Sequence, residues 1–171
     1  IPLFYFDDIE KAIFYAGESS KSTHNTDICI AACRYYVGLI WAILHGASKK
    51  EVLNSAFSPL DWCWEKYKIP KALQAIFEGS YKEKTAEELQ TFWYVANSLE
   101  IALWWFYNAD NFKSGMEIVV NLGGDSDTNA CIYGFLAGAY YGYESFPEAW
   151  KQGLVEKEKI IHFAEQLYIL K

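Results

Sequence analysis

The chain has 171 residues and a net charge of −7, and 52% of its residues are hydrophobic, with 18% aromatic. This length is that of one ordinary domain, and so much apolar material excludes a disordered chain. The acidic balance argues against nucleic acid or an anionic membrane surface as a partner, because both repel negative charge.

The four cysteines, Cys29, Cys33, Cys63 and Cys131, are interpreted as buried free thiols of a protein in a reducing compartment. No Cys-x-x-Cys pair is present, and the three histidines are not spaced with the cysteines as zinc ligands would be. We recognise no signal peptide and no stretch long and apolar enough to span a bilayer. A cytoplasmic protein is therefore expected.

The first half of the chain predicts helices. Residues 7–20 open on acidic side chains, which favour a helix N-terminus. A long helix follows over residues 22–48, with Gly46 as its stop and three candidate caps, Ser22, Thr23 and Asn25. Residues 49–67 predict a less regular helical stretch broken near Pro59, and residues 69–77 a helix with Pro70 in its first turn.

The second half continues in the same way. Polar residues 82–88 predict a loop, and residues 96–109 and 111–122 predict two helices. Residues 117–122 alone suit a strand, but no second strand is available to pair with them. A small-residue helix is predicted for residues 127–141, and a short turn from Pro147. The last helix, residues 156–170, is expected to bury Ile160, Ile161, Phe163, Ala164, Leu167 and Tyr168.

Period-two alternation is almost absent, so the predicted fold class is all-α, with residues 1–171 as a single domain.

One stretch combines glycines with acids between two apolar segments, residues 121–130 (NLGGDSDTNA). If a helix begins here, its first turn holds Asp125, Asp127 and Thr128, where free N–H groups and the helix dipole favour negative charge. A capping turn needs only one such oxygen. Two close carboxylates and a hydroxyl are hard ligands that suit Mg²⁺, and glycines let the backbone approach a ligand. From the spacing, a capping turn and a metal or ligand site both remain open.

Residues 121–142, NLGGDSDTNACIYGFLAGAYYG, resemble the C-terminal metal motif of the ADP-ribosylglycohydrolases, a family of all-α, magnesium-dependent enzymes. Other segments are similar to the family's pattern: Pro2-Leu3, Thr23-His24, residues 98–104, and Pro147 with Trp150. The resemblance covers essentially the whole chain. It implies the compact orthogonal multi-helix domain of this family, with the family's N-terminal part absent.

The resemblance implies hydrolysis of the glycosidic bond that links ADP-ribose to a protein side chain, arginine or serine, or to a related ADP-ribosyl compound. Two Mg²⁺ ions, or Mn²⁺ in their place, are expected. Asp125, Asp127 and Thr128 would be metal ligands, and the two acids would count as catalytic. The implied ligand-binding residues are His24, Gly123, Gly124 and Ser126. For His24, a locally bonded histidine at a helix start remains the alternative.

The family's Gly-Asp-x-x-Gly motif, Thr-Asp-Asp cluster and glycine-serine loop have no counterpart here, so an N-terminal part or a second chain is expected to complete the site. Asp7-Asp8 is similar to the acidic cluster, but two acids that open a helix are ordinary. Trp93 stands where relatives often have Gly, which bears on the choice of substrate. The alternative functions are a non-catalytic family member that binds ADP-ribose or metal, and a purely structural protein.

Overall fold

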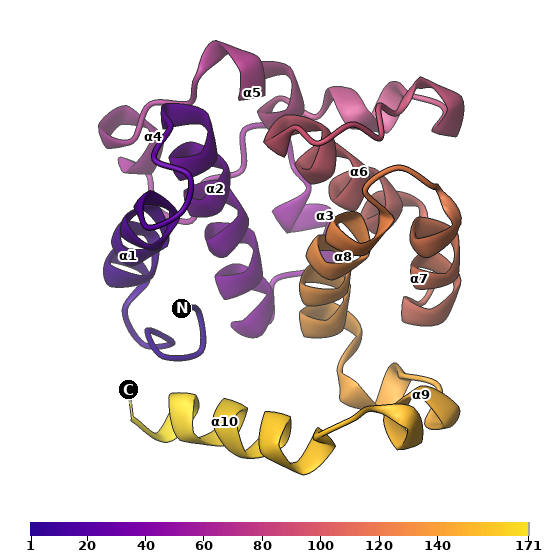
Figure 1. Cartoon of the computed structure of the whole chain (residues 1–171). Helices are drawn as coiled ribbons and strands as arrows, with labels where there is room; N and C mark the ends of the chain where they lie inside the picture. Colours follow the sequence, from indigo (N-terminus) through magenta and orange to yellow (C-terminus); the bar gives the residue numbers. More distant parts are fainter. Residues whose placement is uncertain (171) are drawn as a thin grey trace.

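The computed structural model describes residues 1–170, and within that range the chain forms helices and no strand (Figure 1). The predicted all-α fold class is confirmed. The helices are α1 (Ile9–Lys21), α2 (Asp27–Leu44), α3 (Lys49–Val52), α4 (Cys63–Lys66), α5 (Lys71–Phe77), α6 (Val95–Asn108), α7 (Phe112–Asn121), α8 (Ser126–Tyr141), α9 (Glu148–Gly153) and α10 (Lys157–Ile169). Three 3-10 turns join them, η1 (Ser80–Glu83), η2 (Ala86–Glu88) and η3 (Tyr143–Ser145).

The first two helices begin at side-chain caps. A side-chain oxygen of Asp8 accepts a hydrogen bond from the Lys11 N–H at 3.0 Å, and the Thr26 hydroxyl accepts one from the Cys29 N–H at 3.3 Å. The expectation that Ser22, Thr23 or Asn25 caps the long helix was wrong, because the chain first turns through residues 22–25. Caps of this kind stabilise a helix by about 1 kcal/mol.

The core is organised around α6. Most residues of this helix are buried, Leu103 and Phe106 completely. Its one buried carboxylate, Glu100, is paired with the Lys84 ammonium group at 2.7 Å. The pair offsets the cost of burying an isolated negative charge. α8 packs against α6, α7 and α2. Because α8 therefore lies between three partners, its N-terminal loop has a fixed position at one end of the bundle (Figure 1).

Small residues allow the close contact between α7 and α8. A Cβ on Gly115 of α7 would lie 2.0 Å from the hydroxyl oxygen of Tyr133 on α8. Tyr133 is fully buried, its hydroxyl has no hydrogen-bond partner in the described chain, and burial raises its pKa. Glycine at position 115 is thus required by packing.

α2 is long and apolar enough, by length and composition only, to cross a membrane, with a mean hydropathy of 1.6. The expectation that no stretch would meet this test was wrong. Half of its residues are buried inside the fold, where α2 packs against α1, α6 and α8. Core helices pass the same test of length and composition, so the test carries little weight here.

The last helix, α10, does not bury the side that its periodicity predicts. Among the six residues expected to be buried, Ile160, Phe163, Leu167 and Tyr168 are exposed, whereas Ile161 and Ala164 are half-buried. In Figure 1, α10 runs along the lower edge of the molecule, and its Tyr168 ring lies 5.4 Å from that of Phe6. The sequence pattern correctly predicts an amphipathic helix, but a pattern cannot say which surface covers its apolar face.

All four cysteines are free, as expected, but only Cys63 is buried. Cys29 and Cys33 are half-buried and Cys131 is exposed, so the expectation of burial was wrong for Cys131. Burial raises the pKa of the Cys63 thiol to about 11, against the opposing positive charges of Arg34 and Lys66.

Candidate functional site

The acidic motif forms the start of α8. The helix begins at Ser126, one residue earlier than predicted, and Asp125 is its N-cap residue. The Asp125 carbonyl oxygen accepts a hydrogen bond from the Asn129 N–H at 3.0 Å, but the Asp125 side chain makes no capping hydrogen bond. The structure therefore does not support the interpretation of this motif as a carboxylate-capped turn. The carboxylate of Asp125 stays available for another partner.

The motif lies at the surface of the described chain. Asp127, Thr128 and both glycines are exposed, and Asp125 and Ser126 are half-buried. The described chain leaves this end of α8 uncovered. Two carboxylates and one hydroxyl, close in sequence at a helix start, form a partial set of hard oxygen ligands. Within residues 1–170, no three or more His, Cys, Asp or Glu side chains are grouped to hold a metal ion.

Both glycines adopt backbone angles that other residues avoid. The φ of Gly123 is 75° and that of Gly124 is 63°, in the left-handed region. A Cβ on Gly124 would lie 2.6 Å from the carbonyl oxygen of Thr91, whereas one on Gly123 would meet nothing within 4 Å. Gly124 is therefore needed for a close contact, and that contact places the segment before α6 beside the motif. Sequence reasoning missed Thr91, which carries no local signal.

Asn129 is a second residue that the sequence did not identify as part of the site. It is only 1% exposed, and neither its side-chain oxygen nor its nitrogen has a hydrogen-bond partner in the described chain. Asn129 follows Asp125 by one helical turn, so both residues lie on the same face of α8. A buried amide without partners is costly and is typical of a place where an ion, water or ligand is expected.

His24 lies in the loop between α1 and α2. Its N–H donates to the Ser20 carbonyl oxygen at 2.8 Å and its carbonyl oxygen accepts from the Ser20 hydroxyl at 3.2 Å. The backbone of His24 is thus bonded locally, but its imidazole ring is exposed and makes no hydrogen bond in residues 1–170. The ring is free to contact a ligand.

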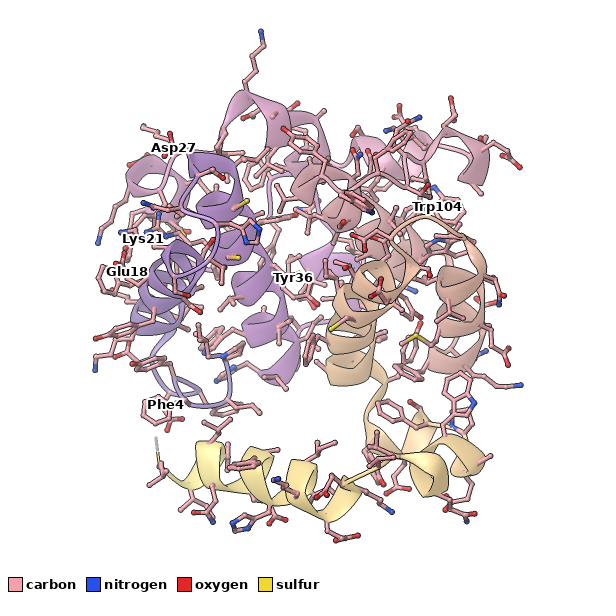
Figure 2. All side chains as sticks on the ribbon, viewed as in Figure 1. Phe4, Glu18, Lys21, Asp27, Tyr36 and Trp104 are labelled. Carbon is pink, nitrogen blue, oxygen red and sulfur yellow. The ribbon has the colours of Figure 1, made fainter. Side chains whose placement is uncertain are left out.

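The N-termini of α2 and α8 face the same end of the molecule. Figure 1 shows the two helices running in the same direction, and Figure 2 shows Tyr36 between them. The Tyr36 hydroxyl of α2 donates a hydrogen bond to the Ile132 carbonyl oxygen of α8. The loop that holds His24 and the motif at Asp125 consequently occupy the same end of the bundle, although the two make no direct contact.

Asp8, which was considered as a substitute metal ligand, caps α1 instead. Its carboxylate accepts the Lys11 N–H and pairs with the Lys11 ammonium group at 3.0 Å. The hydrogen bonds from Lys11 lower the pKa of Asp8. The expectation that this acid serves the helix start is confirmed.

Three exposed aromatic residues stand next to the motif. Phe92, Trp93 and Tyr94 follow Thr91 and are 74%, 88% and 46% exposed. The Tyr94 N–H donates to the Phe92 carbonyl oxygen at 2.7 Å, so the backbone turns sharply at Trp93. We call these three residues the aromatic loop.

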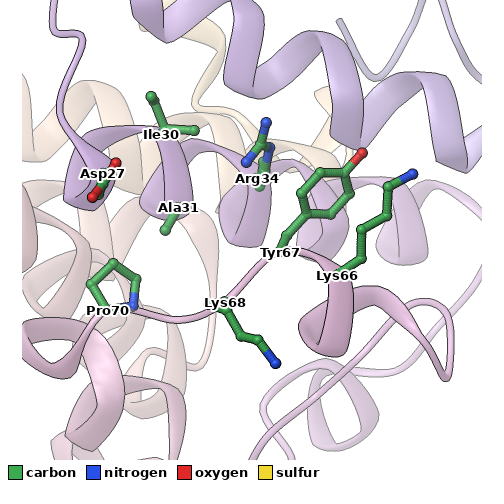
Figure 3. A pocket seen from close by; sticks show the side chains of 8 residues that line it. All are labelled: Asp27, Ile30, Ala31, Arg34, Lys66, Tyr67, Lys68 and Pro70. Atoms are coloured by element: carbon green, nitrogen blue, oxygen red, sulfur yellow. The ribbon is translucent and has the colours of Figure 1, made fainter.

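Two hollows of the surface lie away from the motif. One, of about 350 Å³, lies between α2 and residues 66–70. Its lining includes Arg34, whose guanidinium group stacks 4.1 Å from the centre of the Tyr67 ring (Figure 3). Another, of about 510 Å³, is lined by residues that include Lys49 and Tyr140. None of the candidate site residues lines either hollow.

Several known proteins are similar to this chain in sequence and fold. The family model described as ADP-ribosylglycohydrolase matches residues 1–171. The chain is 32% identical to the ADP-ribosylarginine hydrolase Tri1 of Serratia proteamaculans (strain 568), over 98% of this chain and 43% of that protein. It is 27% identical to the ADP-ribosyl-[dinitrogen reductase] glycohydrolase of Rhodospirillum rubrum, over 81% of this chain and 43% of that protein. The chain therefore spans less than half the length of these relatives.

A solved structure, an ADP-ribosylglycohydrolase-related protein complex, superimposes with a TM-score of 0.86 at 31% identity. The match covers 99% of this chain and 56% of that one. Sequence, fold and the motif at the start of α8 agree with one another, and the chain belongs to the ADP-ribosylglycohydrolase family.

Proposed function

We propose that the protein hydrolyses the glycosidic bond between ADP-ribose and a protein side chain, arginine or serine, in a reaction that requires Mg²⁺. The observation that carries this proposal is the start of α8 in a chain of this family. Two carboxylates follow a glycine loop there, and the N-cap carboxylate of Asp125 makes no capping hydrogen bond. Such carboxylates repel each other, and a divalent cation removes that repulsion.

Each residue of the motif has a role in this proposal. Asp125, Asp127 and Thr128 would hold the metal through two carboxylates and a neutral hydroxyl oxygen. A bound Mg²⁺ ion supplies positive charge that orients ribose hydroxyls and water. Gly123 and Gly124 have no side chain, so their backbone can lie close to the ribose. The Ser126 hydroxyl would hydrogen-bond an oxygen of the ligand. Mn²⁺, which takes the same ligands, is the proposed substitute.

The end of the bundle that carries the motif suits a diphosphate. Helix N-termini present free N–H groups and a partial positive charge, which favour phosphate oxygens. α2 and α8 both begin at this end (Figure 1). His24, whose ring makes no hydrogen bond within the described chain, is proposed to contact the phosphates or the adenosine end of the substrate.

The metal site needs ligands beyond this motif. Mg²⁺ prefers six oxygen ligands, and residues 1–170 hold no group of three or more His, Cys, Asp or Glu side chains suited to a metal ion. We propose that an N-terminal part or a second chain supplies the rest, in keeping with relatives more than twice as long as the matched part. The free thiols fit a reducing, cytoplasmic setting.

A second candidate function is binding without hydrolysis. The partial set of ligands favours it, since three oxygens would hold a metal or the ribose of ADP-ribose only weakly. Such a protein would respond to ADP-ribose without turnover.

One experiment separates the candidates. ADP-ribosylated arginine and serine peptides are incubated with the protein in Mg²⁺ or in EDTA, and the melting temperature is recorded with and without ADP-ribose. An enzyme releases ADP-ribose only in Mg²⁺. A binder shows a higher melting temperature with ADP-ribose but no release. If neither Mg²⁺ nor ADP-ribose changes the melting temperature and no ADP-ribose is released, both candidates are wrong.

A further inference from the structure

The sequence holds a single arginine, Arg34, among its 15 basic residues. It lies on α2 and is half-buried, with its guanidinium group stacked on the Tyr67 ring. Although the sequence has 22 acidic residues, none of those within residues 1–170 forms an ion pair with Arg34. Its Nε atom is buried and has no hydrogen-bond partner in that range. A buried donor without an acceptor is costly, so this group suits a partner that the described chain does not supply.

The guanidinium group is held in place by close packing. Gly17 of α1 lies directly beside it, and a Cβ on Gly17 would stand 2.4 Å from the Nε atom of Arg34. The group is therefore confined by α1 as well as by the Tyr67 ring. A guanidinium fork that is already fixed matches the paired oxygens of a phosphate or a carboxylate, and little conformational freedom is lost when it binds them.

The hollow of about 350 Å³ opens beside this group (Figure 3). Small-molecule sites occupy roughly 300–1,000 Å³, so its volume suits a small ligand. Lys66 and Lys68 also line the hollow, and Asp27 is the one acid in its lining. The lining thus has a net charge of +2, in a protein whose net charge is −7. A phosphate monoester, which carries about −1.5 to −2 at neutral pH, complements that charge better than a single carboxylate does.

The hollow is separate from the acidic motif. Asp27, Ala31 and Arg34 follow one another at intervals of four and three residues, so they lie on one face of α2. Tyr36, whose hydroxyl donates to α8, is two residues beyond Arg34 and so about 200° further around the helix. The hollow and α8 therefore lie on opposite sides of α2.

We propose that this hollow is a binding site for the phosphate group of a small molecule, distinct from the metal site proposed at the start of α8. Arg34 donates hydrogen bonds to two oxygens of the phosphate, and Lys66 and Lys68 add positive charge on flexible stems. The proposal goes beyond the hydrolytic function and does not depend on it, since none of these residues belongs to the acidic motif.

The test titrates inorganic phosphate into the whole protein in EDTA, at constant ionic strength with chloride as the balancing anion. EDTA prevents a metal ion from holding phosphate at the acidic motif. The readout is the Nε–H signal of Arg34 in a 15N-correlated NMR spectrum, identified by its absence from Arg34→Lys. Glycerol 3-phosphate, a phosphate monoester, and acetate, a singly charged carboxylate, are titrated in the same way.

Two variants and a control separate a built site from simple attraction to positive charge. Gly17→Ala keeps every charge but fills the space beside the guanidinium group, which must then move. Arg34→Gln removes the charge and the fork together. Lys71→Gln is the matched control, because Lys71 is an exposed lysine next in sequence to Pro70 that does not line the hollow. Calorimetry gives the Kd of phosphate for each, and the melting temperature checks that each variant is folded.

We expect phosphate to shift the Nε–H signal to saturation and acetate to bind at least about tenfold more weakly. Tighter binding of glycerol 3-phosphate than of inorganic phosphate would identify an ester as the ligand, and the reverse order would identify the free ion. Gly17→Ala and Arg34→Gln should each raise the Kd of phosphate about tenfold or more, and Lys71→Gln less than about twofold.

Three results would overturn the proposal. The first is an Nε–H signal that phosphate does not move, as expected if an N-terminal part or a second chain already places a carboxylate on Arg34. The second is an equal loss of affinity in all three variants, which would indicate attraction to net charge alone. The third is acetate that binds as tightly as phosphate. None of these results bears on the release of ADP-ribose, so the hydrolytic function is judged separately.

Discussion

Gly124 and Thr91 touch so closely that a Cβ on Gly124 would lie 2.6 Å from the Thr91 carbonyl oxygen. The same oxygen accepts the N–H of Asp125 at 3.4 Å. This contact joins the loop before α8 to the segment before α6. It therefore sets where the acidic motif stands relative to the aromatic loop.

The contact predicts different costs for the two neighbouring glycines. Gly123→Ala meets open space and only strains a positive φ, which should lower the free energy of unfolding by about 1 kcal/mol. Gly124→Ala strains φ and also meets the Thr91 backbone, so it should cost about 2–4 kcal/mol. Urea unfolding measures both. Equal losses would mean that the Thr91 contact does not constrain the loop.

A second prediction concerns the packing of α7 on α8. Gly115→Ala should lower the free energy of unfolding by about 2–3 kcal/mol, because the new methyl group meets the Tyr133 hydroxyl. Tyr133→Phe should cost nothing or stabilise the fold, since the buried hydroxyl it removes has no partner in the described chain.

The two changes should couple. Tyr133→Phe removes the oxygen nearest the added methyl group, while the Tyr133 ring carbon at 2.5 Å and the Ala109 Cβ at 2.9 Å remain. We expect the double variant to recover about 1 kcal/mol of the Gly115→Ala loss. Strictly additive losses would show that the hydroxyl is not the obstacle.

Cys63 predicts a loss of stability at alkaline pH. Burial raises the pKa of its thiol from 9.0 to about 11, so the unfolded chain releases this proton at lower pH than the folded chain does. Between pH 9 and pH 11 the unfolded state binds fewer protons, and the free energy of unfolding falls as pH rises. The stabilising contribution is fully present below pH 9, and about 1 kcal/mol of it is lost by pH 10.

Cys63→Ala removes this titration. The variant should lose less stability than the wild-type protein between pH 8 and pH 10, after its own constant cost for the smaller side chain. Tyrosines that burial also protects, such as Tyr81, titrate equally in both proteins and cancel in the comparison. Parallel pH profiles would contradict the expected role of the thiol.

The carboxylates at the start of α8 predict different effects with and without metal. In EDTA, Asp127→Asn should melt close to the temperature of the wild-type protein, because the repulsion from Asp125 that it removes offsets the helix-dipole stabilisation that it loses, and no capping hydrogen bond is broken. With Mg²⁺ it should bind the ion at least about tenfold more weakly, as measured by calorimetry. Asp61→Asn, an exposed acid outside the motif, is the control. A lower melting temperature of Asp127→Asn in EDTA would revive the capping interpretation.

Local sequence signals predicted what is local in this structure. The three- and four-residue spacing of apolar side chains predicted α6 and α10, and the glycines with acids predicted that a helix begins within the motif of α8. The same signals failed where a distant partner decides. Periodicity showed that α10 has an apolar face but not that Ile160 and Phe163 lie exposed.

The candidate site divides in the same way. Asp125, Asp127 and Thr128 are adjacent in the sequence and were predicted together. Thr91 reaches the site only because the chain folds back on Gly124, and Asn129 is notable only because its buried amide has no partner in the described chain. Neither feature leaves a pattern in the sequence, since each depends on contacts that only packing creates.

The most direct test of the central claim is the release of ADP-ribose from an ADP-ribosylarginine peptide, followed first in EDTA and then after Mg²⁺ is restored. We expect no release in EDTA, recovery with Mg²⁺ in the wild-type protein, and no recovery in Asp127→Ala. Release that persists in EDTA, or that survives Asp127→Ala, would contradict a metal-dependent hydrolase centred on the start of α8.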